Sequence, residues 1–116
     1  MPYLKIQTTA AINSSTASTQ NFLKKTSRLV AKELSKPEDY VMVSLEPSSA
    51  MLFAGSAEPT AFLELRGIGL PVKKTGDLSR LLCELVESEL RIPKDRVYIN
   101  FADVPAELWG WNGETF

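Results

Sequence analysis

The opening residues MPYLKI place a proline directly behind the initiator methionine. Methionine aminopeptidases generally remove a methionine that precedes proline, and this removal would leave Pro2 with a free secondary amine. Such an amine is able to act as a base near neutral pH once its pKa is lowered. In isolation, a proline at this position is more often simply the first residue of a strand. Pro2 is therefore a candidate base whose role depends on the residues around it.

The other residue types limit the proton chemistry that is available. The chain contains no histidine and one cysteine, Cys83. A histidine-based triad and an internal disulfide are therefore excluded, and we expect no metal site. Any proton must be moved by a carboxylate, a lysine, a tyrosine or the N-terminal amine. Cys83 itself is interpreted as a small buried apolar residue on a helix.

An internal repeat indicates which elements position these groups. An offset of 56 residues aligns KPEDYVMVSL (36–45) with IPKDRVYINF (92–101), including one proline and one aspartate in each. Each segment is preceded by apolar residues at helical spacing, which predicts an amphipathic helix followed by a proline turn and a strand. The aligned helical residues are Phe22, Leu29, Val30 and Leu34 in the first half and Leu78, Leu85, Val86 and Leu90 in the second.

Two more strands are predicted ahead of the helices, at 2–8 and 60–66. Each half then reads β-α-β, with a helix as the right-handed crossover between parallel strands. The predicted fold is α+β, a β-α-β-β-α-β pseudo-repeat with a four-stranded mixed sheet and two helices on one face. It forms a single domain, 1–116, whose pseudo-repeats span about 2–46 and 58–102. The run SSTAST (14–19) predicts a loop and a cap for the first helix, and Asp77 is predicted to cap the second.

Charge and composition limit the kinds of binding partner that we expect. The chain has 44% hydrophobic residues and 13 basic against 14 acidic side chains, with no long run of either sign, so nothing in its charge predicts nucleic-acid or membrane binding. Its first twenty residues lack the pattern of a signal peptide, so we expect a cytoplasmic protein, with non-classical release left open.

A sheet covered by helices on one face leaves its other face exposed. Several large apolar residues are predicted to lie there or in the C-terminal tail, which is more apolar surface than a monomer of this size easily hides. They are Met42, Phe62, Tyr98, Trp109, Trp111 and Phe116. We therefore expect a closed symmetric oligomer.

Specific motifs accompany this architecture along essentially the whole chain. They are Pro2 after Met1, Lys36-Pro37, Ser56-x-Glu58-Pro59, Gly67-Ile68-Gly69, the run DRVYIN (95–100), and Gly110-Trp111-Asn112 followed by Phe116. In these motifs the chain resembles the macrophage migration inhibitory factor (MIF) family of the tautomerase superfamily. The resemblance implies a homotrimer whose sheets face inward and whose three active sites lie at the subunit interfaces.

The same resemblance implies a reaction. It is the cofactor-independent keto–enol tautomerisation of aromatic α-keto acids such as phenylpyruvate, with Pro2 as the catalytic base. Lys36 would pair with the substrate carboxylate and help to lower the pKa of Pro2, and Asn100 would donate a hydrogen bond to the enolate. The substrate-binding residues that the resemblance implies are Tyr40, Ile68, Tyr98, Trp109, Trp111 and Phe116.

Strand alternation places Tyr98 and Asn100 on one face of the last strand, and in the family these residues reach the neighbouring subunit's pocket. Simpler readings stay open for the individual residues. Lys36 could be a solvated residue at a helix end, Tyr98 and Asn100 ordinary sheet residues, and Trp109 either a core residue or one that narrows the pocket. At the level of the protein, the alternatives are a MIF-like signalling or host-factor-mimicking protein with vestigial or secondary tautomerase activity, and a purely structural trimer.

Overall fold

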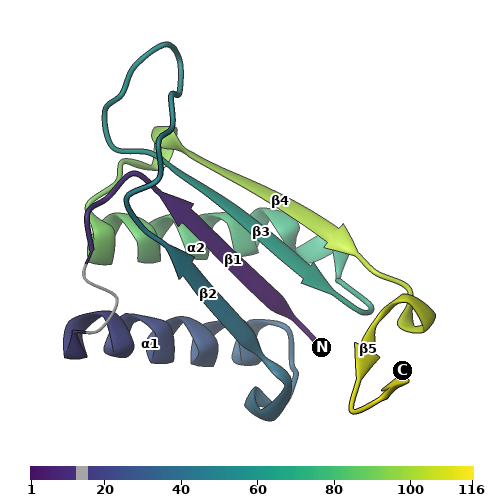
Figure 1. The fold of residues 1–116 in the computed structure, drawn as a ribbon. Coiled ribbons are helices and arrows are strands. Elements are labelled where there is room, and N and C mark those ends of the chain that lie inside the picture. Colours follow the sequence, from purple (N-terminus) through teal and green to yellow (C-terminus); the bar gives the residue numbers. More distant parts are fainter. Residues whose placement is uncertain (13–15) are drawn as a thin grey trace.

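The computed structural model describes residues 1–12 and 16–116 as one mixed sheet with two helices on one face (Figure 1). The elements are β1 (Tyr3–Thr8), α1 (Ala17–Glu33), β2 (Met42–Glu46), β3 (Ala61–Gly67), α2 (Thr75–Leu90), β4 (Val97–Asp103), β5 (Gly110–Trp111) and β6 (Glu114–Thr115). The main sheet has the order β2-β1-β3-β4. Strand β1 is parallel to β2 and antiparallel to β3, and β3 is parallel to β4.

The two halves repeat one another, as the sequence predicts. In each half a helix crosses from one strand to a parallel strand beside it. Pro37 and Pro93, which the repeat aligns, each precede a single 3-10 turn, Glu38–Tyr40 and Lys94–Arg96. The predicted strands at 2–8 and 60–66 agree with β1 and β3 to within one residue at each end.

The core lies between the sheet and the two helices. Alternate residues of β1 and β3 point toward the helices and are buried, because successive side chains of a strand point to opposite faces. The helices complete the core with one apolar face each. The buried residues include Leu4, Ile6, Leu63 and Leu65 from the strands and Phe22, Val30, Leu78, Leu82 and Val86 from the helices. Cys83 is also buried, as expected, and its burial raises the pKa of the thiol.

The two helices begin differently. At α1, the Thr16 hydroxyl accepts a hydrogen bond from the Thr19 N–H at 3.2 Å, so Thr16 is the cap predicted within SSTAST, whereas residues 14 and 15 of that run lie outside the described residues. The predicted cap of α2 is wrong. The helix begins at Thr75 after the 3-10 turn Val72–Lys74, so Asp77 lies inside the first turn. There its carboxylate interacts favourably with the positive end of the helix dipole, but it does not cap the helix.

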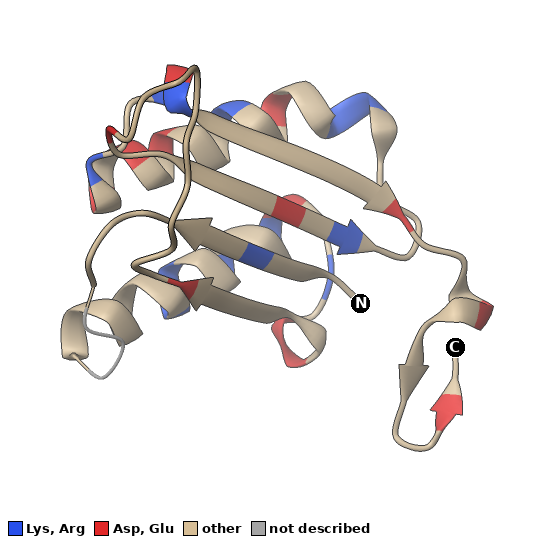
Figure 2. Cartoon of the chain, turned by 45° about the horizontal axis from the view of Figure 1, so that its top comes forward, with Lys and Arg blue, Asp and Glu red and all other residues tan. Residues whose placement is uncertain are grey.

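Charged residues lie within strands β1, β2 and β3 (Figure 2), and the edge strands also carry exposed apolar residues. The Lys5 ammonium nitrogen on β1 forms an ion pair with a Glu46 carboxylate oxygen on β2, at 3.5 Å. Met42 and Tyr98, on the two edge strands, are each 64% exposed. Of the described helices, neither is long and apolar enough to cross a membrane.

The chain ends in a small hairpin that lies beyond one end of the sheet, close to the N-terminus (Figure 1). Strands β5 and β6 are joined through Asn112 and Gly113, both at positive φ (53° and 81°), which is the geometry of a type I′ turn and explains the Asn-Gly pair. The Phe116 N–H donates to the Trp109 carbonyl at 3.2 Å and ties the last residue to the hairpin base.

Candidate active site

Pro2 lies at the start of β1 with its side chain less than 2% exposed. Its carbonyl accepts a hydrogen bond from the Met42 N–H at 3.0 Å, which extends the β1–β2 pairing to the first residues of the chain. Two hollows adjoin it. The smaller, of about 10 Å³, is shared with Lys36 and Ile68. The larger, of about 310 Å³, opens toward the aromatic residues of the tail.

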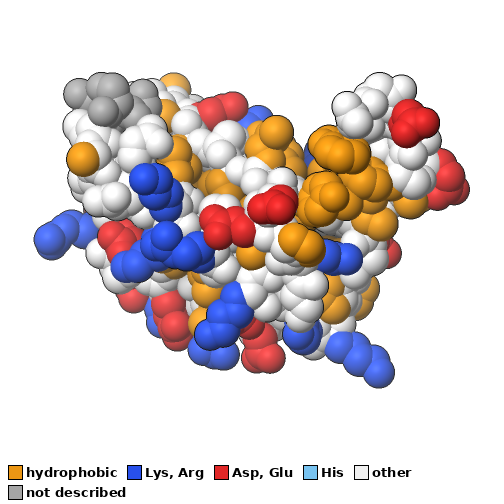
Figure 3. Space-filling model, turned by 90° about the horizontal axis from the view of Figure 1, so that it is seen from below, with side chains coloured by type: hydrophobic (Ala, Val, Ile, Leu, Met, Phe, Trp, Pro, Cys, Tyr) orange, Lys and Arg blue, Asp and Glu red, His pale blue; other side chains and the backbone are white. Residues whose placement is uncertain are grey.

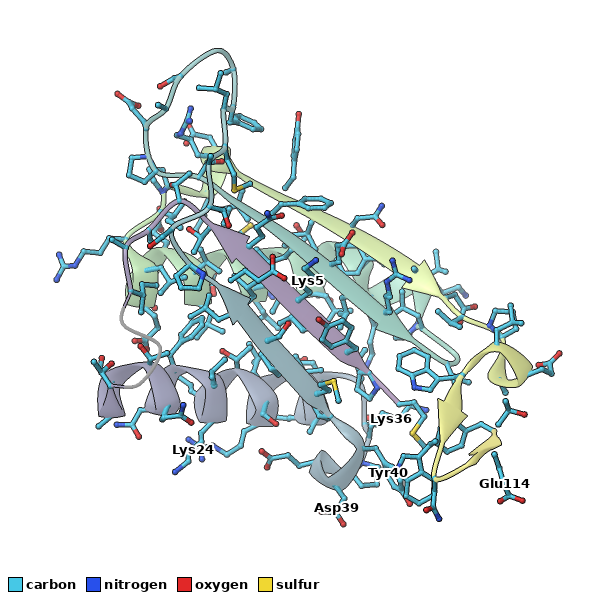
Figure 4. All side chains as sticks on the ribbon, in the orientation of Figure 1. Lys5, Lys24, Lys36, Asp39, Tyr40 and Glu114 are labelled. Atoms are coloured by element: carbon cyan, nitrogen blue, oxygen red, sulfur yellow. The ribbon has the colours of Figure 1, made fainter. Side chains whose placement is uncertain are left out.

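Lys36 is placed by the way α1 ends. Ser35 adopts a left-handed conformation (φ 53°), and the Lys36 N–H donates to the Ala31 carbonyl at 2.9 Å while the Ser35 N–H donates to the Lys32 carbonyl at 3.2 Å. This is the pair of hydrogen bonds of a Schellman motif. It turns the chain away from the helix axis and brings the half-buried Lys36 to the hollow beside Pro2 (Figure 4).

Ile68 lies in the turn that follows β3. The turn contains Gly69 at φ 68°, a conformation that other residues rarely adopt. It is anchored at both ends, because the Leu70 N–H donates to an Asp103 carboxylate oxygen at 3.1 Å and the Val104 N–H donates to the Gly67 carbonyl at 2.8 Å. The end of β4 thus holds the Ile68 turn against Pro2.

Aromatic side chains form the wall of the larger hollow. The Tyr40 ring meets the Trp111 ring edge-on, with 5.6 Å between centroids, and the Trp111 ring stacks on that of Phe116 at 5.8 Å. Trp109 is half-buried and lines the same hollow together with Met42. Figure 3 shows hydrophobic side chains gathered at the base of the arm formed by the C-terminal residues. Such a surface suits a flat apolar group such as a phenyl ring.

The electrostatics of the site favour a neutral amine. Burial lowers the pKa of the N-terminal amine, which in this chain is that of Met1, and the nearby Lys36 ammonium lowers it further. Both effects act against the charged form. Burial and a neighbouring cation act in this same direction on any amine at this end of β1.

Tyr98 and Asn100 do not join this cluster within one chain. Tyr98 pairs through Phe62 with Gln7 of β1, and Asn100 pairs through Glu64 with Lys5. With about 3.3 Å per residue along a strand and about 4.8 Å between strands, Tyr98 lies roughly 20 Å and Asn100 roughly 14 Å from Pro2. Figure 1 shows the starts of β1 and β4 at opposite ends of the sheet.

One chain therefore brings together seven of the nine predicted site residues around its N-terminus and leaves two on the open sheet face. The seven are Pro2, Lys36, Tyr40, Ile68, Trp109, Trp111 and Phe116. Sequence reasoning missed Met42 as a lining residue, because strand alternation predicted only that it would be exposed. It also missed Asp103, whose carboxylate anchors the turn after β3. This role becomes visible only in the structure, where the ends of β3 and β4 lie side by side. Among the described residues, no group of three or more His, Cys, Asp or Glu side chains is arranged to hold a metal ion.

Comparison with known proteins agrees with this architecture. A family model described as macrophage migration inhibitory factor (MIF) matches residues 1–116. The macrophage migration inhibitory factor homolog of Brugia malayi is 42% identical over 117 residues, which cover 100% of this chain and 99% of the relative. The macrophage migration inhibitory factor of Rattus norvegicus is 38% identical over 98 residues, covering 84% of this chain and 85% of the relative.

Solved structures give the same result. The crystal structure of the macrophage migration inhibitory factor homologue from Prochlorococcus marinus superposes with a TM-score of 0.92 at 43% identity and covers 98% of both chains. The structure of the macrophage migration inhibitory factor from Trichinella spiralis has a TM-score of 0.90 at 35% identity, and the match covers 98% of this chain and 99% of the Trichinella chain. This chain, with its buried Pro2 and paired β-α-β units, belongs to the macrophage migration inhibitory factor family of the tautomerase superfamily.

Proposed function

We propose that the chain, once Met1 has been removed, is a cofactor-independent keto–enol tautomerase of aromatic α-keto acids such as phenylpyruvate, with Pro2 as the catalytic base. The observation that carries this proposal is the setting of the terminal amine. Partial burial, and then the nearby Lys36, lower the pKa of the Met1 amine, and Pro2 beside it adjoins a hollow with an aromatic wall. Surroundings that lower the pKa of an amine, a cation for the carboxylate and a surface for the phenyl ring thus adjoin one another.

The reaction requires two proton transfers. The Pro2 lone pair takes a proton from the methylene carbon next to the carbonyl, so that a C–H bond breaks and an N–H bond forms. The resulting enolate holds the negative charge on oxygen, where the Asn100 amide donates a hydrogen bond and so lowers the barrier. The Pro2 ammonium then gives its proton to that oxygen, which yields the enol and regenerates the neutral amine. Lys36 holds the substrate carboxylate throughout.

Removal of Met1 is part of the proposal. While Met1 is attached, the nitrogen of Pro2 is an amide and has no basic lone pair. Met1 also lines both hollows around Pro2. Its removal therefore supplies the base and enlarges the space that a substrate would occupy.

Assembly as a homotrimer completes the proposed site. Because Asn100 and Tyr98 lie roughly 14 and 20 Å from Pro2 in the same chain, they serve a pocket only if they reach that of a neighbouring subunit. Their position on an open sheet face, with Tyr98 64% exposed, supports this arrangement. A closed ring gives every subunit the same pair of contacts.

The test is the rate of phenylpyruvate enol–keto interconversion, followed by ultraviolet absorbance on protein whose intact mass shows that Met1 is absent. We expect turnover well above the buffer rate, reduced by about 10²–10⁴ in Pro2→Gly, because that is the usual contribution of a positioned base. Lys24→Gln is the matched control, since Lys24 lies exposed on α1 and lines neither hollow beside Pro2. Equal rates in the wild type and Pro2→Gly would contradict the assignment and favour a binding role for the pocket.

A further inference from the structure

A single arginine organises the long connection between β2 and β3. Arg96, the residue before β4, donates hydrogen bonds to four backbone carbonyls of this loop, those of Phe53, Ser56, Glu58 and Pro59, at 2.9–3.2 Å. Only a guanidinium can make this set of bonds, because its donors are fixed in a planar fork. The segment 53–59 is thereby fastened to the start of β4.

The ring of Phe53 connects this anchor to Tyr98. The Arg96 guanidinium carbon lies 5.3 Å from the centre of the Phe53 ring, within the range of a cation–π contact. The same ring also contacts Tyr98, at 4.8 Å between centroids and 73° between planes, an edge-to-face pair. Arg96, Phe53 and Tyr98 thus form a continuous stack on the open face of the sheet.

We infer that Arg96 and Phe53 are positioning residues that fix the orientation of the Tyr98 ring for the neighbouring subunit's pocket. This inference rests on the proposed function, in which Tyr98 contacts the substrate. The Tyr98 side chain is 64% exposed, and without the Phe53 ring beside it the phenol would be free to exchange rotamers. Ordering the ring in advance removes part of the entropic cost of binding a substrate.

The expected signature is a change in KM with little change in kcat. Tyr98 is proposed to contact the bound substrate and not the proton that moves, so its orientation affects ground state and transition state alike. We expect Phe53→Leu, which keeps an apolar side chain but loses the ring, to raise KM about threefold to tenfold, the usual strength of an aromatic pair. Arg96→Lys should act in the same direction, because lysine keeps the charge but cannot hold the four carbonyls.

A double-mutant cycle separates positioning from general damage to the loop. In a Tyr98→Ala background, Phe53→Leu should leave KM unchanged, because the residue through which it acts is absent. Glu58→Gln is the matched control, since Glu58 is exposed in the same loop and only its backbone meets Arg96. A Phe53→Leu effect of equal size in both backgrounds, or none in the wild type, would overturn the inference.

A second readout does not depend on activity. The chain has three tyrosines, so protein labelled with 3-fluorotyrosine should give three ¹⁹F resonances, of which Tyr98→Phe identifies one. Phe53→Leu and Arg96→Lys should both shift that resonance and leave the other two in place. If the Tyr98 resonance stays unchanged in both variants, the inference is wrong, whatever the kinetics show. A shifted resonance in a protein that does not turn over phenylpyruvate would instead support the positioning and refute the proposed substrate.

Discussion

Mixing two inactive variants tests whether each active site is shared between subunits. One variant carries Pro2→Gly, which replaces the fixed secondary amine of the proposed base by the more mobile primary amine of glycine. The other carries Asn100→Ala and lacks the donor to the enolate. Each alone should be nearly inactive, since a base contributes about 10²–10⁴ and a placed donor on the order of 10² in rate. Because Asn100 lies roughly 14 Å from Pro2 in its own chain, the two residues can meet only across an interface.

The size of the recovered activity follows from this geometry. If the chain assembles as the proposed trimer, random mixing of equal amounts of the two variants gives a site an unaltered Pro2 in half of the cases. It has an unaltered Asn100 from its neighbour in half of the cases as well, so about one quarter of the sites are complete. If both residues acted within one chain, every site would carry one defect and no activity would return.

The assay is phenylpyruvate turnover by ultraviolet absorbance after joint refolding, with native mass spectrometry to count the mixed trimers. A mixture of wild type with the double variant Pro2→Gly/Asn100→Ala is the control. It should also recover about one quarter of the wild-type rate if the site is shared, but about one half if it is not. Values of zero and one half in the two mixtures would refute a site built across subunits.

Two further predictions concern the charge beside Pro2 and the core between the sheet and the helices. Lys36→Gln should move the acidic limb of the pH profile of kcat/KM to higher pH. The base works only when neutral, and the Lys36 ammonium lowers the pKa of the terminal amine. An acidic limb that stays in place would exclude this effect of Lys36 on the base. Leu63→Ala, at a residue that is 0% exposed, should lower the free energy of unfolding by about 2–5 kcal/mol. Urea denaturation at equal subunit concentration measures this loss. The control is Val72→Ala, at a residue that is 72% exposed, which should change the free energy of unfolding by less than about 0.5 kcal/mol.

The sequence predicts the fold well because each element has a local signal. The helices carry apolar residues at helical spacing, and the 56-residue repeat assigns them to two equivalent β-α-β units. The cap of α2 could not be predicted in the same way. Asp77 is a common capping residue, but the 3-10 turn that follows Pro71 starts the helix at Thr75, so that Asp77 falls within the first turn.

The site is predictable only in part, for a physical reason. Pro2, Lys36 and the C-terminal aromatic residues come from motifs, and the structure brings them together around the hollows described above. Arg96 belongs to the DRVYIN motif, but nothing in that motif indicates which groups it contacts, and Phe53 belongs to none of the motifs. Their contacts join a loop without periodicity to the start of a strand, and the partners of Arg96 are backbone carbonyls, which leave no pattern in the side chains.

The most direct test of the central claim compares two forms of the same protein, one with Met1 removed and one that retains it after expression under inhibition of methionine aminopeptidase. The two forms differ only in Met1 and in whether the nitrogen of Pro2 is an amine or an amide. We predict phenylpyruvate turnover in the form without Met1 and only the buffer rate in the form that keeps it. Equal turnover in both forms would show that the Pro2 amine is not the base.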